Sequence, residues 1–339
     1  MIFTRRRHLR VAGSVALLLA IVLQAKSANA EAPVLRVAQQ FGIAYLPITV
    51  VKERGLFEKH AKRLGLADTK IEWHRLSGAS AMNDALISGS LDFASAGIAP
   101  MIVTWDKTRG SVNVIGIAAL GSMPNVLTTN NPNIKTIADF KDGDKIALPS
   151  VKVGFQPIVL QMAADKLFGK YDKLDHLTVS LPHPDAAAAL LSGVSGITAH
   201  FTSPPFVQQE LANSKIHAVL SSYDVVGGPH TFNVVYASKK FVDNNPTIVS
   251  AFVDALDEAN AWIIAHPEEA ARLYIAAEKS KLTPDFVTAI VKDKNIRFTT
   301  TPERSEVFAD FEARVGIIKH KPKDWRELFQ SGLYSRAGS

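Results

Sequence analysis

Residues 85–94 (ALISGSLDFA) and residues 189–198 (ALLSGVSGIT) are similar to each other. Each stretch has the pattern of a helix that ends in Ser-Gly, with the glycine at the left-handed C-cap position, followed by a short strand. Another helix is expected after each strand, from Gly97-Ile98 in the first copy and from Pro204 in the second. The similarity favours two related α/β lobes that face each other. The alternative is a chance likeness between two ordinary helix–strand turns.

The rest of the chain shows the same alternation. Buried strands are expected at residues 34–38 and 112–118, among others, and helical patterns separate them. Such alternation is typical of a mainly parallel sheet with flanking helices. The pattern is interrupted at residues 122–124 and again in the glycine-rich bend at 227–233. These interruptions predict where the chain enters and leaves the second lobe.

The first 30 residues have the three parts of a cleavable export signal. Four arginines lie between residues 5 and 10, an apolar run follows at 11–23, and Ala28 and Ala30 have the spacing that a signal peptidase reads. The apolar run is shorter than the ~20 residues of a membrane-spanning helix, which argues against the alternative of a permanent anchor. We therefore expect a signal peptide at residues 1–30, cleaved after Ala30, and a mature protein in the periplasm.

The export route stays open between two possibilities. The arginine-rich start resembles a twin-arginine signal, but His8 stands where that signal usually has phenylalanine. Ordinary Sec export is the other possibility.

The export segment also carries most of the excess positive charge. The chain has 38 Lys and Arg against 32 Asp and Glu, a net charge of +6, and residues 1–30 hold five of those basic residues and no acid. The remaining chain is nearly neutral, which removes the compositional support for a nucleic-acid or anionic-membrane partner. Hydrophobic residues make up 47% of the chain, as expected of a globular protein with a substantial core. The chain contains no cysteine, which excludes thiol redox chemistry and thiolate–metal sites.

The sequence contains none of the common catalytic or cofactor motifs. A Walker phosphate loop, G-x-G-x-x-G, H-E-x-x-H and G-x-S-x-G are all absent. The histidines are scattered, with no pair at ligand spacing on one expected helix, and residues 142–144 (DGD) are typical of a surface turn. We therefore predict no catalytic residue, no metal and no cofactor, although a catalytic triad can assemble from distant positions.

Several motifs, in their order and spacing, resemble a known family. They are 40–47 (QFGIAYLP), 52–59 (KERGLFEK), 76–78 (LSG), 83–86 (NDAL), 88–94 (SGSLDFA), 97–100 (GIAP) and 137–147 (IADFKDGDKIA). Together they are similar to the periplasmic solute-binding proteins of ABC importers of the nitrate/sulfonate/taurine type, a group that includes thiamine-pyrimidine binders. The resemblance covers nearly the whole chain after residue 30.

The resemblance implies a type II periplasmic binding protein fold. In that fold each of two lobes is a mainly parallel sheet with flanking helices, and two hinge crossovers let the lobes close on a ligand. Lobe one would hold residues 31–123 and 232–339, with the C-terminal helices, and lobe two residues 124–231. The implied partners are a small-molecule ligand and an ABC permease with its cytoplasmic ATPase, and the protein would be a monomer.

In such folds the ligand lies outside the carboxyl ends of the strands, where helix N-termini point into the crevice. This rule selects the candidate ligand-binding residues, which are Gln40, Phe41, Tyr45, Ser77, Gly78, Gly97, Ile98, Ser150, Lys152, Phe155, Gln156, His200, Thr202 and Ser203.

Each candidate also has a structural role to be weighed against ligand binding. Ser77 and Ser203 could cap helices, Lys152 could be a solvated loop lysine, and His200 could be a core histidine. Taken together, however, loops that end in Ser, Thr or Gly at helix starts suit an anion held by N–H groups and hydroxyls. The predicted loops contain no arginine and several aromatic residues. We therefore expect a small organic anion of the sulfonate or carboxylate class.

Two alternatives to this function remain. One is an exported enzyme on the same scaffold, against which the absence of cysteine argues, because the related thiamine-precursor synthases use a His- and Cys-containing site. The other is a thiamine-pyrimidine-type binder.

Overall fold

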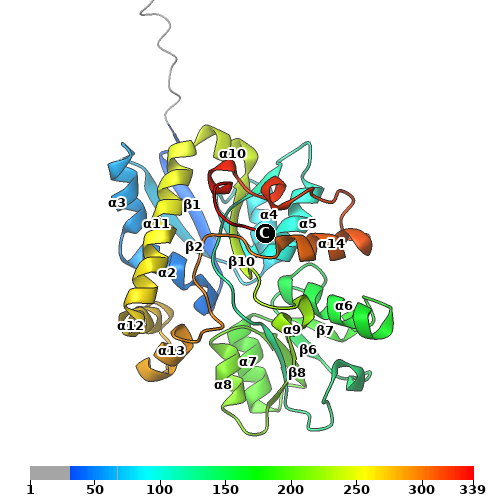
Figure 1. Cartoon of the computed structure of the whole chain (residues 1–339). Coiled ribbons are helices and arrows are strands. Elements are labelled where there is room, and N and C mark those ends of the chain that lie inside the picture. Colours follow the sequence, from blue (N-terminus) through cyan, green and yellow to red (C-terminus); the bar gives the residue numbers. More distant parts are fainter. Residues whose placement is uncertain (1–30, 67) are drawn as a thin grey trace, which may run out of the picture.

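The computed structural model describes residues 31–66 and 68–339. The predicted signal peptide and its cleavage site lie outside the described residues. Two α/β bodies, here called lobe one and lobe two, lie one above the other in Figure 1, and the chain crosses between them. None of the described helices is both long and apolar enough to cross a lipid bilayer.

Lobe one contains two short sheets that one parallel bridge, between Val37 and Phe93, joins edge to edge. One sheet pairs β1 with β2 in parallel, and the other has the order β3-β10-β4 with β10 antiparallel to both neighbours. The strands are β1 (Val34–Gln39), β2 (Lys70–Arg75), β3 (Ala94–Gly97), β4 (Val114–Ala119) and β10 (Asn233–Ser238).

Lobe two contains one five-stranded sheet of order β7-β6-β8-β5-β9. Strand β6 is parallel to β7 and β8, whereas β5 runs antiparallel to β8 and β9. The strands are β5 (Val126–Thr129), β6 (Ile146–Leu148), β7 (Thr178–Ser180), β8 (Ala199–Thr202) and β9 (His217–Ser221).

The strand orders of the two lobes correspond one to one. Across the Val37–Phe93 bridge the strands of lobe one follow the order β2-β1-β3-β10-β4, and those of lobe two follow β7-β6-β8-β5-β9. The fourth strand in each order, β10 or β5, is antiparallel to its neighbours and is the strand that enters from the other lobe. The mixed α/β architecture that the sequence predicts is therefore confirmed, with the qualification that the strand entering each sheet runs against its neighbours.

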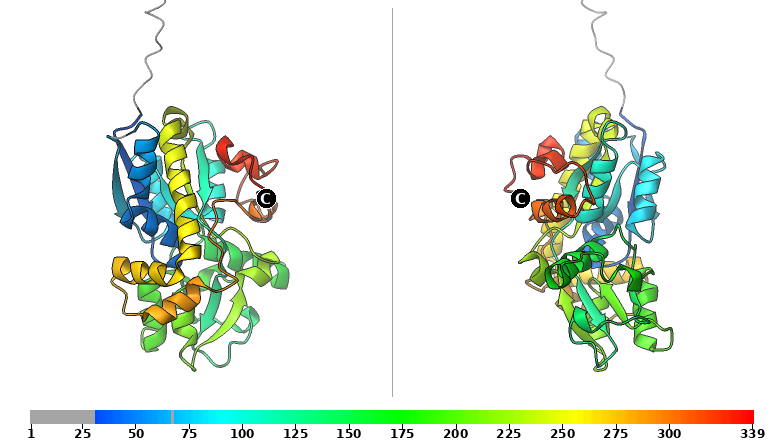
Figure 2. Two further views of the ribbon diagram at one scale, coloured as in Figure 1. Left: turned by 60° about the vertical axis from the view of Figure 1, so that its left-hand side comes forward. Right: turned by 90° about the vertical axis from the view of Figure 1, so that its right-hand side faces the viewer.

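Helices cover the faces of the sheets, as Figures 1 and 2 show. Those of lobe one include a long helix, α11, which packs against α2 and α3. The helices are α2 (Leu46–Glu53), α3 (Leu56–Arg63), α4 (Ala79–Ile87), α5 (Ile98–Lys107), α6 (Phe155–Phe168), α7 (His183–Ser192), α8 (Phe206–Leu211), α9 (Ser222–Val226), α10 (Lys239–Asn244), α11 (Pro246–Ala265), α12 (Pro267–Glu278), α13 (Pro284–Val291) and α14 (Ser305–Arg314). Short 3₁₀ turns lie at Ile43–Tyr45, Ile137–Asp139, Asp175–Leu177, Trp325–Leu328 and Ser331–Leu333.

The two similar stretches of sequence occupy equivalent places, α4–β3 and α7–β8. After each helix, two successive N–H groups donate to one carbonyl of the neighbouring strand region: those of Asp92 and Phe93 to Arg36, and those of Thr198 and Ala199 to Lys145. Gly89 ends α4 with a φ of 76°. The second turn contains two such glycines, Gly193 and Gly196, with φ of 68° and 75°, although six residues separate the helix from the strand in both copies.

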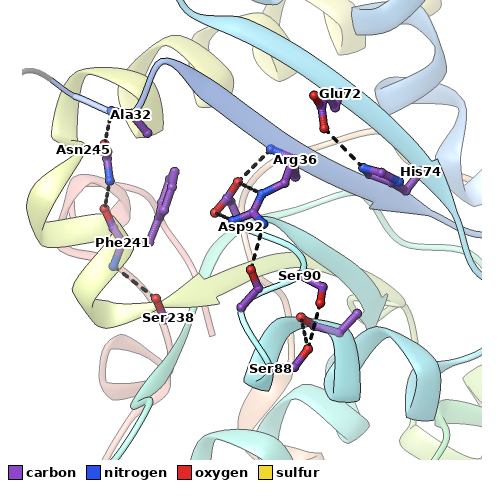
Figure 3. Close-up of polar contacts among 12 residues, drawn as sticks. Ala32, Arg36, Glu72, His74, Ser88, Ser90, Asp92, Ser238, Phe241 and Asn245 are labelled. Atoms are coloured by element: carbon purple, nitrogen blue, oxygen red, sulfur yellow. Dashed lines mark hydrogen bonds and ion pairs between the residues drawn. The ribbon is translucent and has the colours of Figure 1, made fainter.

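In lobe one a partly buried ion pair fixes this turn (Figure 3). Asp92 Oδ2 accepts from the backbone N–H and the Nε of Arg36, at 2.8 and 2.9 Å, and Oδ1 accepts from Nη2 at 2.8 Å. Arg36 Nη1 also donates to the carbonyl of Gly89 at 2.8 Å. A bidentate pair of this kind is strong and directional. It ties the α4–β3 turn to β1, so that β1 and β3 end side by side.

The crossovers between the lobes carry a buried histidine, His230. Its Nδ1 lies 3.0 Å from the carbonyl of Thr231 and its Nε2 lies 3.0 Å from Ser222 Oγ, which in turn accepts from the N–H of Asn125. The ring therefore donates from Nδ1 and accepts at Nε2, and it needs to be neutral to do so. Burial lowers the pKa of His230 to about 4.

We expect His230→Gln to make the protein less sensitive to acid. In the unfolded chain a histidine takes up its proton near pH 6.5, so the native state loses free energy of unfolding as the pH falls from about 6.5 to about 4. For this one ring the loss amounts to roughly 3 kcal/mol. Glutamine has no such proton to take up, and urea unfolding at pH 7, 6, 5 and 4 should therefore show a shallower decline for the variant. The same decline in both proteins would contradict the assignment, and exposed His74→Gln serves as the control.

Candidate ligand-binding cleft

The carboxyl ends of the parallel strands of the two lobes face each other across a cleft. Helices or turns begin directly after these strands, and glycine occupies the N-cap at four of them, which are Gly42, Gly78, Gly97 and Gly154. None of the four N-termini receives a hydrogen bond from a capping side chain. Three first-turn N–H groups already have partners: Ile43 donates to the carbonyl of Pro204, Ile98 to the carbonyl of Phe232, and Ser80 to Ser150 Oγ at 3.4 Å. The other first-turn N–H groups are available to a ligand or to water.

Both lobes contribute to the walls of the cleft. The lining residues are mostly aromatic or small and polar, and they are Gln40, Phe41, Tyr45, Ala79, Gly97, Pro149, Ser150, Gly154, Phe155, Gln156, His183, Ser203, Phe232 and Asn233. The cleft volume is about 20 Å³, which is room for about one water molecule. The lobes are thus closed in this structure, and they must separate before a small organic molecule can enter.

Glycines allow this close approach. A Cβ atom on Gly78 would lie 2.5 Å from Ser150 Oγ and 2.7 Å from the carbonyl oxygen of Pro149, and one on Gly97 would lie 2.5 Å from Phe155 Cβ. At a third point the N–H of Ile43 donates to the carbonyl of Pro204 at 3.0 Å. Main chain of lobe one therefore lies directly against lobe two.

Eight of the fourteen residues predicted from the sequence line the cleft. They are Gln40, Phe41, Tyr45, Gly97, Ser150, Phe155, Gln156 and Ser203. Gly78 lies at the contact between the lobes, and His200 lies fully buried behind the wall. Ile98 and Thr202 are buried, and Ser77 is exposed outside the lining. Lys152 is exposed and lies near Asp175, away from the cleft; burial raises the pKa of that carboxyl, and the Lys152 charge offsets part of the rise.

Six lining residues were not predicted, which are Ala79, Pro149, Gly154, His183, Phe232 and Asn233. Two of them have polar side chains. His183 follows β7, and the rule that ligands lie beyond strand ends would have found it had it been applied to that strand. Asn233 begins β10, which runs antiparallel, so its amino end and not its carboxyl end reaches the cleft.

Side chains with a fixed positive charge are absent from the lining. Arg75 contacts the lining residue Phe41 but does not line the cleft itself. Its guanidinium stacks over the Phe41 ring at 4.8 Å and makes a bidentate ion pair with Glu278, with distances of 2.5 and 2.6 Å. The Tyr45 side chain is 3% exposed, and burial raises its pKa well above the usual value, so its hydroxyl stays neutral. Asn233 is likewise buried; its side chain lies beside the Tyr45 hydroxyl and offsets part of the rise in that group's pKa, although its Nδ2 makes no well-aligned hydrogen bond among the described residues. A buried donor without a partner is costly, and the acceptor of a ligand would satisfy it.

A chain of hydrogen bonds runs from the cleft into the core of lobe two. His183 Nδ1 lies 2.8 Å from His200 Nε2, and His200 Nδ1 lies 2.6 Å from Glu210 Oε1. The hydroxyl of Thr128 donates to Glu210 Oε2 at 2.6 Å. On the cleft side, His183 Nε2 lies 3.4 Å from the amide nitrogen of Gln156.

Two protonation states fit this geometry. A carboxylate only accepts, so His200 donates from Nδ1 in both; with both rings neutral its Nε2 accepts from Nδ1–H of His183, and with one more proton the His183–His200 bond runs the other way. In the first state His183 Nε2 is a bare acceptor, which suits the amide N–H of Gln156 beside it. Burial lowers the pKa of His183 well below its usual value, and His200 lowers it further. Among the described residues no three acidic or histidine side chains are arranged to hold a metal ion.

We expect Gly78→Ala and Gly97→Ala to hold the lobes apart. Both glycines have φ angles that alanine adopts readily, −171° and −59°, so the effect comes only from the new methyl group against lobe two. Small-angle X-ray scattering should give a larger radius of gyration for each variant than for the wild type. Gly89→Ala, which has open space around its new methyl group but a φ of 76° that strains alanine, is the control for destabilisation without contact between the lobes. An unchanged radius in both cleft variants would contradict the closed arrangement.

Known proteins share this architecture. A sequence model of the NMT1-like family matches residues 28–277. The alkanesulfonate-binding protein of Xanthomonas axonopodis pv. citri, solved with MOPS bound, has a TM-score of 0.66 at 16% identity, over 86% of this chain and 96% of that one. For the periplasmic nitrate-binding protein of Synechocystis PCC 6803 the TM-score is 0.69 at 16% identity, over 90% and 88%.

A third relative is the periplasmic aliphatic sulphonate-binding protein of Escherichia coli. Its TM-score is 0.63 at 19% identity, over 89% of this chain and 93% of that one. No curated protein sequence matches the chain. At these identities the structures show the fold, and they confirm the two-lobed architecture expected from the sequence. The family model matches well over half of the chain, and the chain therefore belongs to the NMT1-like family.

Proposed function

We propose that this chain is the extracytoplasmic solute-binding component of an ABC importer and captures a small organic anion, a sulfonate or a carboxylate, between its lobes. The observation that carries the proposal is the cleft itself. Two lobes of like topology meet at the ends of their strands, with uncapped helix N-termini on both sides. The named relatives bind sulfonates and nitrate.

The proposal includes the organisation that the sequence predicts. Lobe one comprises residues 31–123 and 232–339, and lobe two residues 124–231. The protein is exported to the periplasm, is a monomer, and delivers its ligand to a permease coupled to a cytoplasmic ATPase. Of the fourteen residues selected from the sequence, the eight that line the cleft, together with His183 and Asn233, are the proposed ligand-contacting set, and the other six lie outside that lining.

The aromatic walls favour an anion with an organic body. Phe41, Phe155 and Phe232 line the cleft together with Tyr45, and they offer apolar area that a bare inorganic ion cannot use. Asn233, with its unpartnered amide N–H, and the two serines Ser150 and Ser203 supply polar contacts. A polar head at the helix N-termini and an apolar body against the rings would satisfy both parts.

One observation favours the second candidate, an exported enzyme. The hydrogen-bonded chain of His183, His200 and Glu210 ends at the cleft, and buried histidines aligned by a carboxylate also serve as general bases. The two functions differ in what happens to the bound molecule. A binding protein returns its ligand unchanged, whereas an enzyme converts it.

We expect at least one organic anion to raise the melting temperature of the purified protein. The panel comprises benzoate, benzenesulfonate, ethanesulfonate, nitrate and the neutral pyrimidine thymine. A ligand at 100 times its Kd adds about 2.7 kcal/mol to the free energy of unfolding. Asn233→Ala should reduce the shift, because it removes a donor at the cleft. The matched control is Asn260→Ala on α11, which removes another buried asparagine without partners, remote from the cleft lining.

Two results would contradict the binding function. One is the absence of a shift with every anion of the panel. The other is chemical conversion of the compound that binds, detected by chromatography of the recovered ligand, which would favour the enzyme.

A further inference from the structure

The buried chain of His183, His200 and Glu210 gives the cleft a property that its other walls lack. Every other polar group of the lining is neutral and fixed, whereas this chain can gain or lose a proton. Its three side chains come from three elements, α7, β8 and α8, and both His200 and Glu210 have no exposed surface. The charge that the chain carries is therefore felt at the cleft with little screening by water.

Glu210 is held as a carboxylate by two short hydrogen bonds. Its oxygens lie 2.6 Å from His200 Nδ1 and 2.6 Å from the hydroxyl of Thr128. Distances this short are typical of bonds to an ionised acceptor. With both rings neutral, the chain has a net charge of −1 in the core of lobe two and presents a lone pair, on His183 Nε2, to the cleft.

An anion would meet two obstacles at such a wall. The bare Nε2 of His183 repels an acceptor, and the charge of Glu210 lies behind it without a compensating cation. One proton removes both obstacles. We propose that the cleft binds an organic anion together with one proton, which the His183–His200–Glu210 chain holds, so that His183 Nε2–H donates to the ligand. This inference rests on the proposed function and names the chemistry of its site.

The path of the proton follows the hydrogen bonds. The proton is taken from solvent at His183 Nε2, and the proton on His183 Nδ1 moves across the 2.8 Å bond to His200 Nε2. His200 is then an imidazolium ion beside the Glu210 carboxylate, and the chain is neutral. His183 remains a neutral ring that now donates from Nε2, and the amide of Gln156 is released to contact the ligand.

Other titratable groups do not face His183 among the described residues. Helix α7 packs against α8, β8 and β6. Of these, α8 contributes only Glu210, β8 only His200, and β6 has no titratable side chain. Asp185, on the same helix, is exposed. The neighbours from α6 and β5 are Gln156 and Thr128, which do not titrate. His183 is therefore the ligand-contacting residue, and His200 and Glu210 are positioning residues that determine its proton.

The pH dependence has a definite sign. Burial holds the pKa of His183 well below its usual value when the cleft is closed, and an anion beside Nε2 raises it, because it favours the protonated chain. Between these two pKa values, binding takes up a proton. Affinity for an anion therefore increases as the pH falls, by up to about tenfold for each pH unit in that interval.

The first test uses the ligand-free protein and the ¹⁵N chemical shifts of its histidine rings, assigned with His183→Gln and His200→Gln. At neutral pH we expect Nδ1–H and a bare Nε2 on both rings, and on acidification the two rings should take up one proton jointly. An Nε2–H on His183 at neutral pH, or independent titration of the two rings, would overturn the inference without any ligand.

The second test counts protons by titration calorimetry in buffers of different ionisation enthalpy, with benzoate as the anion and benzamide as its neutral counterpart. We expect uptake of about one proton for each benzoate bound, none for benzamide, and a benzoate Kd that rises up to about tenfold per pH unit. His183→Gln should bind benzoate more weakly and without dependence on pH.

Glu210→Gln gives the sharpest result. The glutamine amide can accept from Thr128 and donate to His200 Nδ1. Both rings then carry their proton on Nε2, so that His183 donates from Nε2 without an added proton. Benzoate should then bind without proton uptake, and at high pH more tightly than to the wild type. A loss of structure alone would weaken binding at every pH. His217→Gln, in the same lobe but bonded to the carbonyl of Ile134, should behave as the wild type.

The outcomes separate this inference from the function on which it rests. Benzoate binding without proton uptake in the wild type, or with equal uptake in Glu210→Gln, overturns the inference and leaves the binding function intact. If no anion of the panel binds at any pH, both fail.

Discussion

Direct contact between main-chain segments of the two lobes is the constraint on which the site depends. Gly78 and Gly97 stand where lobe two comes so close that a single methyl group would not fit. The same glycines are N-caps of α4 and α5, without a capping side chain. Closure and the absence of a capping side chain therefore come from one choice of residue. A serine or aspartate there would cap its helix better, but it would hold the lobes apart and cover the amides.

The electrostatics of the cleft follow from what this closure leaves inside. No lysine or arginine side chain lines it, and the Arg75 guanidinium, which stacks on the lining residue Phe41, is paired with Glu278. A negative side chain, Glu210, lies two hydrogen bonds behind the wall. Helix N-termini alone supply only partial charges. Any full positive charge at the wall therefore has to be carried by a proton on the histidine chain.

The sequence predicted the architecture because the features that determine it are local. Alternating strands and helices, and the Ser-Gly turns at Gly89 and Gly193, can be read from short stretches. The predicted cleft residues that line it follow parallel strands, where the rule of strand ends applies. The rule did not predict Asn233 because β10 runs antiparallel, so that its amino end reaches the cleft. The hydrogen-bonded chain of histidines was not predicted because its members lie 17 and 10 residues apart on three elements. These spacings match neither the helical nor the strand period. Lys152 was also predicted as a ligand-binding residue, but it is exposed outside the cleft lining, on a left-handed backbone with a φ of 63°.

The small volume of the closed cleft has a thermodynamic consequence. A form with room for about one water molecule is too small for an organic solute, so on the proposed function it differs from both the open and the liganded form; we call it collapsed. The collapsed form competes with the solute for the open one. Its population reduces the apparent affinity by the fraction of molecules that it removes from the binding-competent pool. The contacts at Gly78 and Gly97 thus stabilise a form that competes with the solute. This competition lowers occupancy at low solute concentration and opposes rebinding after the solute has left.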